Sequence, residues 1–269
     1  MASSNSMSGL IECYPLDEVD SAGVPGIWQV CIRHPEKLNA MSRSMWHGLR
    51  AVFEQLQADA LRGKVRCVIM SGAGQAFCAG GDISEYPSFR FDTQQLQAFH
   101  ENDVWGGLQA ILNCDAPVRA CIEGACMGAG VEIAACCDIR IVAADAKFGA
   151  PIARLGFPMA PKEIQLVGRA LNGHTVRRML LEAAIFSADD MVQQGFAIYP
   201  PQGGNVHAGA LQMARRMAAL APQAARMTKQ TLRASVQGHQ LADPYGYADS
   251  QEHHEGIMAF LEKRQPQFK

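Results

Sequence analysis

The order of strand-like and helix-like segments predicts an α/β fold that ends in a helical region. Strands alternate with helices over the first part of the chain, two of those strands run into glycine-rich turns, and residues 161–263 are almost entirely helical in pattern. Parallel strands need long crossover connections, which are usually helices, so this alternation favours a mostly parallel sheet. No stretch rich in Pro, Gly or Ser divides the chain into independent domains.

The α/β part begins with a strand pair and a capped helix. The paired strands are separated by a turn at Gly23–Gly26, and Ser42 or Ser44 can cap the helix that follows. In chain order we expect strands at 9–15, 27–33, 65–70, 117–122 and 138–143, and helices from 42 or 44 to 58, at 93–112 and at 131–136.

The last third is predicted to be helical, apart from one short strand at 196–199. Residues 210–220 and 222–236 are amphipathic, and Pro222 stands near a first turn, where a helix accepts proline. We therefore divide the chain into a leader at 1–8, an α/β core at 9–202 that holds the site, and a helical region at 203–269 that serves oligomerisation.

Composition disfavours several classes of function. The formal charge is −2 over 269 residues, so no broad basic surface for nucleic acid is expected. No apolar run approaches the ~18 residues of a membrane span, and the first nine residues lack the apolar core of a signal peptide. The nine cysteines form no CxxC pair, so we expect no metal site and buried free thiols in a reducing, cytoplasmic compartment.

Two glycine-rich turns are the most informative features. Residues 77–83 (FCAGGDI) follow one predicted strand, and residues 124–132 (GACMGAGVE) follow another and enter a helix. Glycine lets backbone N–H groups approach a ligand closely, and a helix start adds unpaired donors and a positive dipole end. The spacing does not match the G-x-G-x-x-G dinucleotide motif, and the GK[ST] of a P-loop is absent, so a nucleotide enzyme is disfavoured.

Further segments accompany the two turns in a fixed order along nearly the whole chain. They are Pro35–Ala40 (PEKLNA), the continuation of the second turn to Asp138, Phe148–Pro151 (FGAP), Pro222, Thr228-Lys229 and Glu255–Lys263. With them the chain resembles the crotonase superfamily, the enoyl-CoA hydratase/isomerase enzymes. The resemblance implies a spiral core of ββα units with a helical C-terminal region, a coenzyme A thioester as substrate with no other cofactor, and homotrimers that pair into hexamers.

The resemblance also implies an oxyanion hole and one acid or base. Family members hold the thioester oxygen of an enolate between two backbone N–H groups, which by position are those of Gly81 and Ala129. Negative charge builds on that oxygen as Cα loses a proton, so fixed donors stabilise the transition state. Glu132 lies about one helical turn beyond Ala129 and matches a catalytic acid/base position of the family. Taken alone, it is better explained as a glutamate favoured by the helix dipole.

One departure from the family pattern bears on the reaction. Hydratases of the family commonly carry a second glutamate in a motif such as F-G-x-P-E, whereas Ile152 follows Pro151 here. Glu163 is a candidate substitute, but an exposed residue at a helix start is the expectation we prefer. With Glu132 alone, three reactions remain: addition of water, isomerisation by a proton shuttle between carbons, and a specialised dehydration or decarboxylation.

The resemblance places the contacts with the acyl-CoA thioester around the turns. Lys37 is the best candidate for a phosphate contact, whereas Arg33 and Arg43 are explained as well by surface charges. Tyr86–Phe91 and His100 are candidates for the acyl pocket or for ordinary loop and helix surface. The predicted substrate contacts are Lys37, Leu38, Ala40, Ala79, Gly80, Asp82, Ile83, Gly128, Pro151 and Ile152.

We therefore predict an enoyl-CoA hydratase-like lyase of fatty acid metabolism. The nearest alternatives are an enoyl-CoA isomerase and a CoA lyase or decarboxylase that uses Glu132 alone. A non-catalytic acyl-CoA or protein-binding member of the fold is disfavoured, because such a module does not need Glu132 beside two intact turns. A serine peptidase of this fold needs a nucleophile after the second turn, and no serine stands there.

Overall fold

The main sheet has five strands in the order β1-β2-β3-β4-β6. The computed structural model describes residues 9–16, 26–201 and 204–268. β1 and β2 are antiparallel, with Leu10 opposite Arg33, and every later pair in the sheet is parallel. The strands are β1 (Leu10–Pro15), β2 (Ile27–Arg33), β3 (Cys67–Gly72), β4 (Val118–Ile122) and β6 (Ile139–Val142). The expected mostly parallel sheet is confirmed.

A second, three-stranded sheet lies against the first and was not predicted. It consists of β5 (Ala125–Met127), β7 (Lys147–Gly149) and β8 (Ile185–Ser187). Only Glu123 and Gly124 separate β4 from β5, so the chain leaves one sheet, enters the other and continues directly into α4 (Ala129–Cys136). This is a ββα unit, as the predicted fold class requires. Residues 125–127 of the second glycine-rich segment, expected to be a turn, form β5 of the second sheet.

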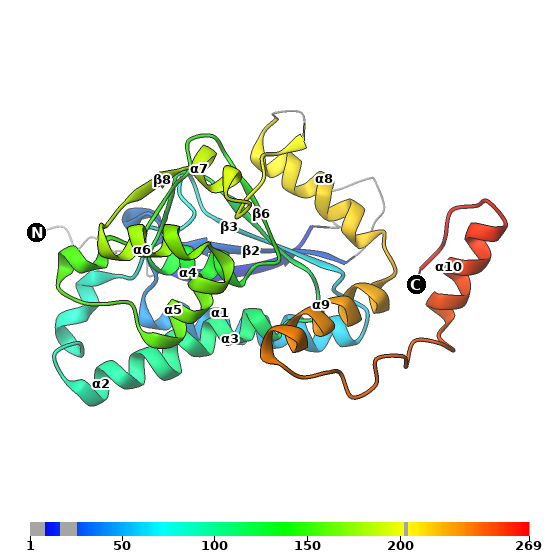
Figure 1. Cartoon of the computed structure of the whole chain (residues 1–269), viewed down its shortest axis with the longest axis horizontal. Coiled ribbons are helices and arrows are strands. Elements are labelled where there is room, and N and C mark those ends of the chain that lie inside the picture. The colour runs from blue at the N-terminus through cyan, green and yellow to red at the C-terminus, as the bar shows by residue number, and fades with distance from the viewer. Residues whose placement is uncertain (1–8, 17–25, 202–203, 269) are drawn as a thin grey trace, which may run out of the picture.

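Helices cover both faces of the main sheet, because successive strand residues point to opposite faces. On β3, Val68 and Met70 pack in one core with α1 (Arg43–Leu61) and α3 (Trp105–Asn113), which also pack against each other. Cys67 and Ile69 face the opposite way, toward α8 (Val206–Ala218). Figure 1 shows α1 and α3 on one side of the strands and α8 on the other.

The helix expected at 93–112 is confirmed, but its middle is π-helical: the chain runs without a break from α2 (Thr93–Ala98) through a π-helical turn η4 (Phe99–Val104) into α3. The strand expected at 196–199 is wrong, because only Ile198 pairs, in a single bridge to Ile141 of β6 in the main sheet. The remaining elements are η2 (Pro35–Lys37), η3 (Ile83–Ser88), η5 (Pro151–Leu155), α5 (Pro161–Ala170), α6 (Gly173–Leu181), α7 (Ala188–Gln193), α9 (Pro222–Gln237) and α10 (Gln251–Leu261).

The C-terminal region is helical, as expected. Figure 1 shows α9 beside the body of the molecule and α10 reaching away from it. Along α10, Ile257, Phe260 and Leu261 are exposed. The predicted leader at 1–8 and the boundary at 202/203 lie outside the described residues, so this division of the chain stays a prediction. None of the described helices is both long and apolar enough to cross a membrane.

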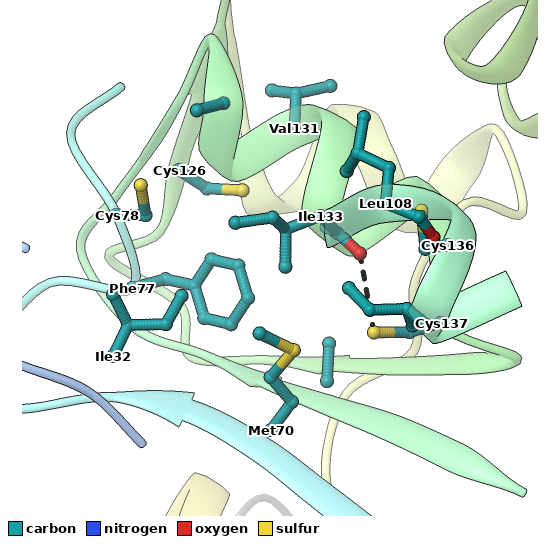
Figure 2. Close-up of a cluster of buried hydrophobic side chains, with 14 of the residues drawn as sticks. Ile32, Met70, Phe77, Cys78, Leu108, Cys126, Val131, Ile133, Cys136 and Cys137 are labelled. Carbon is teal, nitrogen blue, oxygen red and sulfur yellow. Dashed lines mark hydrogen bonds between the residues drawn. The ribbon is translucent and has the colours of Figure 1, made fainter. Parts of the chain in front are cut away.

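The core beneath the glycine-rich turns is apolar and rich in cysteine. All nine cysteines are free, and all but the half-buried Cys13 are buried, which confirms the expected free thiols. Figure 2 shows Phe77, Cys78 and Cys126 packed below α4, where the Cys137 thiol donates to the Ile133 carbonyl oxygen at 3.4 Å. Burial raises the pKa of the Cys78 thiol to about 12, so this side chain is a neutral packing group.

Candidate active site

The two glycine-rich turns lie side by side and are held together by backbone hydrogen bonds. The Cys78 N–H donates to the Ala125 carbonyl oxygen at 2.9 Å, and the Met127 N–H donates to the Cys78 carbonyl oxygen at 2.9 Å. A Cβ at Gly130 would lie 2.6 Å from that same Cys78 oxygen, so only glycine permits this approach. The positions of the turns relative to each other are therefore fixed by the backbone.

The backbone N–H groups of Gly81 and Ala129, one from each turn, have no partner among the described residues. In each turn the preceding glycine has a left-handed φ, +117° at Gly80 and +47° at Gly128. The Gly128 N–H is used, donating to Gly149 at 2.8 Å. No side chain caps the start of α4, so the Ala129 N–H also carries the positive end of the helix dipole. Two unpaired donors that line one pocket are what the predicted oxyanion site requires.

Glu132 stands in the first turn of α4, beside these donors. Its side chain is 9% exposed and makes no hydrogen bond to the described residues. Burial, and second the negative charge of Glu163, raise the pKa of Glu132 to about 8. At neutral pH this carboxyl group is therefore mostly protonated and able to donate a proton.

The donors and Glu132 line one cavity of about 260 Å³. A neighbouring cavity of about 650 Å³ shares four apolar wall residues with it, Ile152, Phe157, Pro158 and Met159. Of the predicted site residues, the smaller cavity brings together Ala79, Gly80, Gly81, Ile83, Gly128, Ala129, Glu132, Pro151 and Ile152. Tyr86 and His100, expected either in the pocket or on ordinary surface, also line it.

The other four predicted contacts do not line the cavity. The Lys37 ammonium donates to an Asp82 carboxylate oxygen at 2.6 Å and to the Ser84 hydroxyl at 2.7 Å. Burial opposes ionisation of Asp82, but the bond from Lys37 and those that the Ser84 hydroxyl and N–H donate to Asp82 Oδ1 hold the pKa of its carboxyl group below the ordinary value. Leu38 is 58% exposed and Ala40 is buried. Lys37 and Asp82 thus form an ion pair beside the first turn.

A second titratable pair reaches the cavity and was missed by sequence reasoning. The His100 imidazole lines the wall, and its Nδ1 lies 3.0 Å from a carboxylate oxygen of Glu163. Glu163 is 2% exposed, so the expectation of an exposed helix-start residue is wrong. Pro161 at the start of α5 predicts that Glu163 is in a first turn, but the direction of its side chain depends on how α5 packs against η4.

Arg90 also lines the cavity and was named only within the broad Tyr86–Phe91 segment. Its guanidinium carbon lies 4.5 Å from the centre of the Tyr86 ring and 3.8 Å from that of Phe157. The neighbours in that segment differ in environment: Phe89 is buried, whereas Phe91 is 88% exposed. The segment thus contributes individual side chains to the site and not a continuous surface.

Comparison of the chain with known proteins identifies the family to which it belongs. The model of the family "Enoyl-CoA hydratase/isomerase" matches residues 23–269. Mevalonyl-coenzyme A hydratase of Beauveria bassiana is 29% identical over 91% of this chain and 92% of its own. The 2,3-dehydroadipyl-CoA hydratase of Escherichia coli is 28% identical over 88% and 93%. A crystal structure of an enoyl-CoA hydratase/carnithine racemase from Magnetospirillum magneticum has a TM-score of 0.85 at 32% identity, covering 91% and 92%. The chain belongs to the enoyl-CoA hydratase/isomerase family.

Proposed function

We propose that the protein adds water reversibly to the double bond of a 2-enoyl-CoA thioester. One observation carries the proposal: the unpaired N–H groups of Gly81 and Ala129 face the same cavity as Glu132. Relatives at 28–29% identity that are named as hydratases support the same class of reaction.

The backbone donors act on the thioester oxygen. As water attacks Cβ, electrons move onto that oxygen and an enolate forms, so the bonds from Gly81 and Ala129 strengthen as charge develops. Such donors are fixed before the reaction and need no reorganisation during it, and losing one costs roughly 10²–10³-fold in rate in other enzymes.

Hydration also needs two proton transfers, and the cavity offers a group for each. Glu132, protonated at neutral pH, donates a proton to Cα of the enolate. Glu163 holds the Nδ1–H of His100, which leaves Nε2 to accept a proton from water as its hydroxyl joins Cβ. Ile152 can take no part in either transfer. After turnover Glu132 is ionised and His100 is protonated. Glu132 then takes up a proton from solvent and His100 releases one, which restores the starting state.

Binding of coenzyme A and oligomerisation of the protein are further parts of the proposal. Coenzyme A enters as part of the substrate, with no other cofactor, and Lys37 at the first turn contacts its phosphates. We propose a homotrimer or homohexamer, because the exposed Ile257, Phe260 and Leu261 of α10 form an apolar face suited to another copy. Light scattering on the protein as it elutes from a size-exclusion column measures its mass. A monomer at micromolar concentration contradicts this assembly.

The test is an assay with crotonyl-CoA and longer 2-enoyl-CoA thioesters, followed by loss of the conjugated thioester absorbance. Ile152 at the usual place of a second glutamate favours one rival, an isomerase that uses Glu132 alone. A parallel assay with 3-enoyl-CoA separates the two, because an isomerase creates the absorbance that a hydratase removes. Turnover of 3-enoyl-CoA without any hydration contradicts the hydratase proposal.

A further inference from the structure

Arg90 carries a charge into the cavity wall without an anionic partner. Its guanidinium makes no hydrogen bond or ion pair within the described residues, although it contacts the rings of Tyr86 and Phe157. Other arginines packed on an aromatic ring do have partners: Arg43 lies over Phe89 and pairs with Asp103 at 2.8 Å. The five N–H groups of Arg90 therefore remain available to a ligand.

This arrangement has an energetic cost that an anion would offset. Burial lowers the pKa of Arg90, which means that its surroundings disfavour the charge. The two aromatic rings attract the cation but accept no hydrogen bond in the plane of the guanidinium. A planar carboxylate can accept two parallel N–H bonds from that plane, which makes it the best-matched partner.

The Tyr86 ring contacts both Arg90 and the predicted oxyanion site. A Cβ on Gly81 would be 2.1 Å from the Tyr86 hydroxyl oxygen, so that hydroxyl lies directly against Gly81. Arg90 packs on the same Tyr86 ring. An acyl chain bound at the Gly81 N–H and running along Tyr86 therefore leads toward Arg90.

The other charges around Arg90 permit an added carboxylate. Glu163 lies near enough to influence Arg90, but its carboxylate binds His100. Glu132, on α4, is mostly protonated at neutral pH. Asp82, beyond Tyr86, is paired with Lys37. None of these groups occupies the guanidinium edge of Arg90.

We propose that Arg90 binds a carboxylate at the far end of the acyl group, so that the preferred substrates are CoA monothioesters of short dicarboxylic acids. This inference rests on the proposed function, because it needs the thioester at Gly81 and Ala129. The phosphates of coenzyme A are the other source of an anion for Arg90, and the experiment separates the two sources.

The test is calorimetric binding of two unreactive, saturated thioesters with equal carbon number, glutaryl-CoA and valeryl-CoA. Charged hydrogen bonds of this kind correspond to about 10- to 100-fold in affinity, so wild type should bind glutaryl-CoA tighter by that factor. Arg90→Met should remove the preference and leave the affinity for valeryl-CoA unchanged within about twofold. Arg90→Lys, which keeps the charge without the planar fork, should retain a smaller preference.

Arg178→Met is the matched control. Arg178 also lies over an aromatic ring, Phe186, but it is exposed, pairs with Glu182 and does not line the cavity. This variant should keep the full preference, and thermal melts check that all variants fold.

Equal weakening of both ligands by Arg90→Met overturns the proposal, because it shows a contact with the shared coenzyme A portion or a general change of the pocket. Equal affinities in wild type overturn it as well. Equal affinities together with hydration of crotonyl-CoA by wild type would contradict the carboxylate subsite alone, and the hydratase proposal would stand. A wild-type protein that binds neither thioester contradicts both proposals.

Discussion

The floor and the wall of the cavity are built in different ways. The floor consists of the two turns, residues 78–81 and 126–129, together with Glu132, and its geometry is made by backbone hydrogen bonds and glycine conformations. The wall consists of the side chains of Tyr86, Arg90, His100 and Phe157, with Glu163 behind His100. Under the proposed function, the floor would form the enolate of many thioesters, whereas the wall would select the acyl group and serve the second proton transfer.

The largest effect is expected on the floor, from Glu132→Gln. The amide keeps the shape of the side chain but cannot donate its proton as an acid, so kcat should fall by roughly 10²–10⁴-fold with little change in KM. Steady-state kinetics with crotonyl-CoA measure both constants. Unchanged kcat would show that Glu132 is only a helix-start residue.

The next largest effect is expected from the loss of one backbone donor. Gly81→Pro removes the N–H and should lower kcat by roughly 10²–10³-fold. Gly81→Ala is the control for crowding, since its Cβ would meet the Tyr86 hydroxyl at 2.1 Å but the N–H stays. A kcat for Gly81→Pro equal to that of Gly81→Ala would assign the whole effect to crowding and contradict the donor role.

On the wall, His100→Gln should lower kcat by about 10²-fold, at the lower end of acid–base effects. Wild-type kcat/KM should decline as pH rises above about 8, where Glu132 loses its proton. Glu163→Gln should also lower kcat, because the carboxylate that lies 3.0 Å from Nδ1 of His100 is lost and the imidazole is no longer held in position. Glu163→Asp should restore part of the rate.

The control for these wall variants is His47→Gln, which affects an exposed histidine paired with Asp103 outside the cavity. It should leave kcat unchanged. If Glu163→Asp restores none of the rate that Glu163→Gln loses, Glu163 supports the fold and does not position His100.

The two turns of the floor could be located from sequence because their determinants are local, whereas the roles of Gly81, Ala129 and Glu132 were predicted only from the family resemblance. Gly80, Gly128 and Gly130 mark the turns directly, and the strands before them are short apolar runs. The wall could not be predicted in the same way. His100 and Glu163 are 63 residues apart and meet through a π-helical turn and the packing of α5, neither of which has a local sequence signal. The second sheet was missed because strands of three residues are too short for periodicity to reveal.

The smallest effect concerns stability. Folded Glu132 keeps its proton up to about pH 8, whereas an unfolded glutamate releases it near 4.5, so the folded state binds more protons in this window. The stability contributed by Glu132 therefore falls as pH rises from about 4.5 to 8. The melting temperature of Glu132→Gln should lie several degrees above that of wild type at pH 9 and close to it at pH 5. Differential scanning fluorimetry measures both. An equal difference at both pH values would contradict the buried, protonated carboxyl group.

The central claim is that the floor alone forms the enolate, and exchange of the α-protons of butyryl-CoA with deuterium oxide tests it most directly. This saturated thioester cannot be hydrated, so NMR or mass detection of α-deuterium reports enolate formation by itself. We predict exchange in wild type, loss of roughly 10²-fold or more in Gly81→Pro and Glu132→Gln, and a rate within a few fold of wild type in His100→Gln. Exchange that survives both floor variants, or that disappears in His100→Gln, would contradict the account.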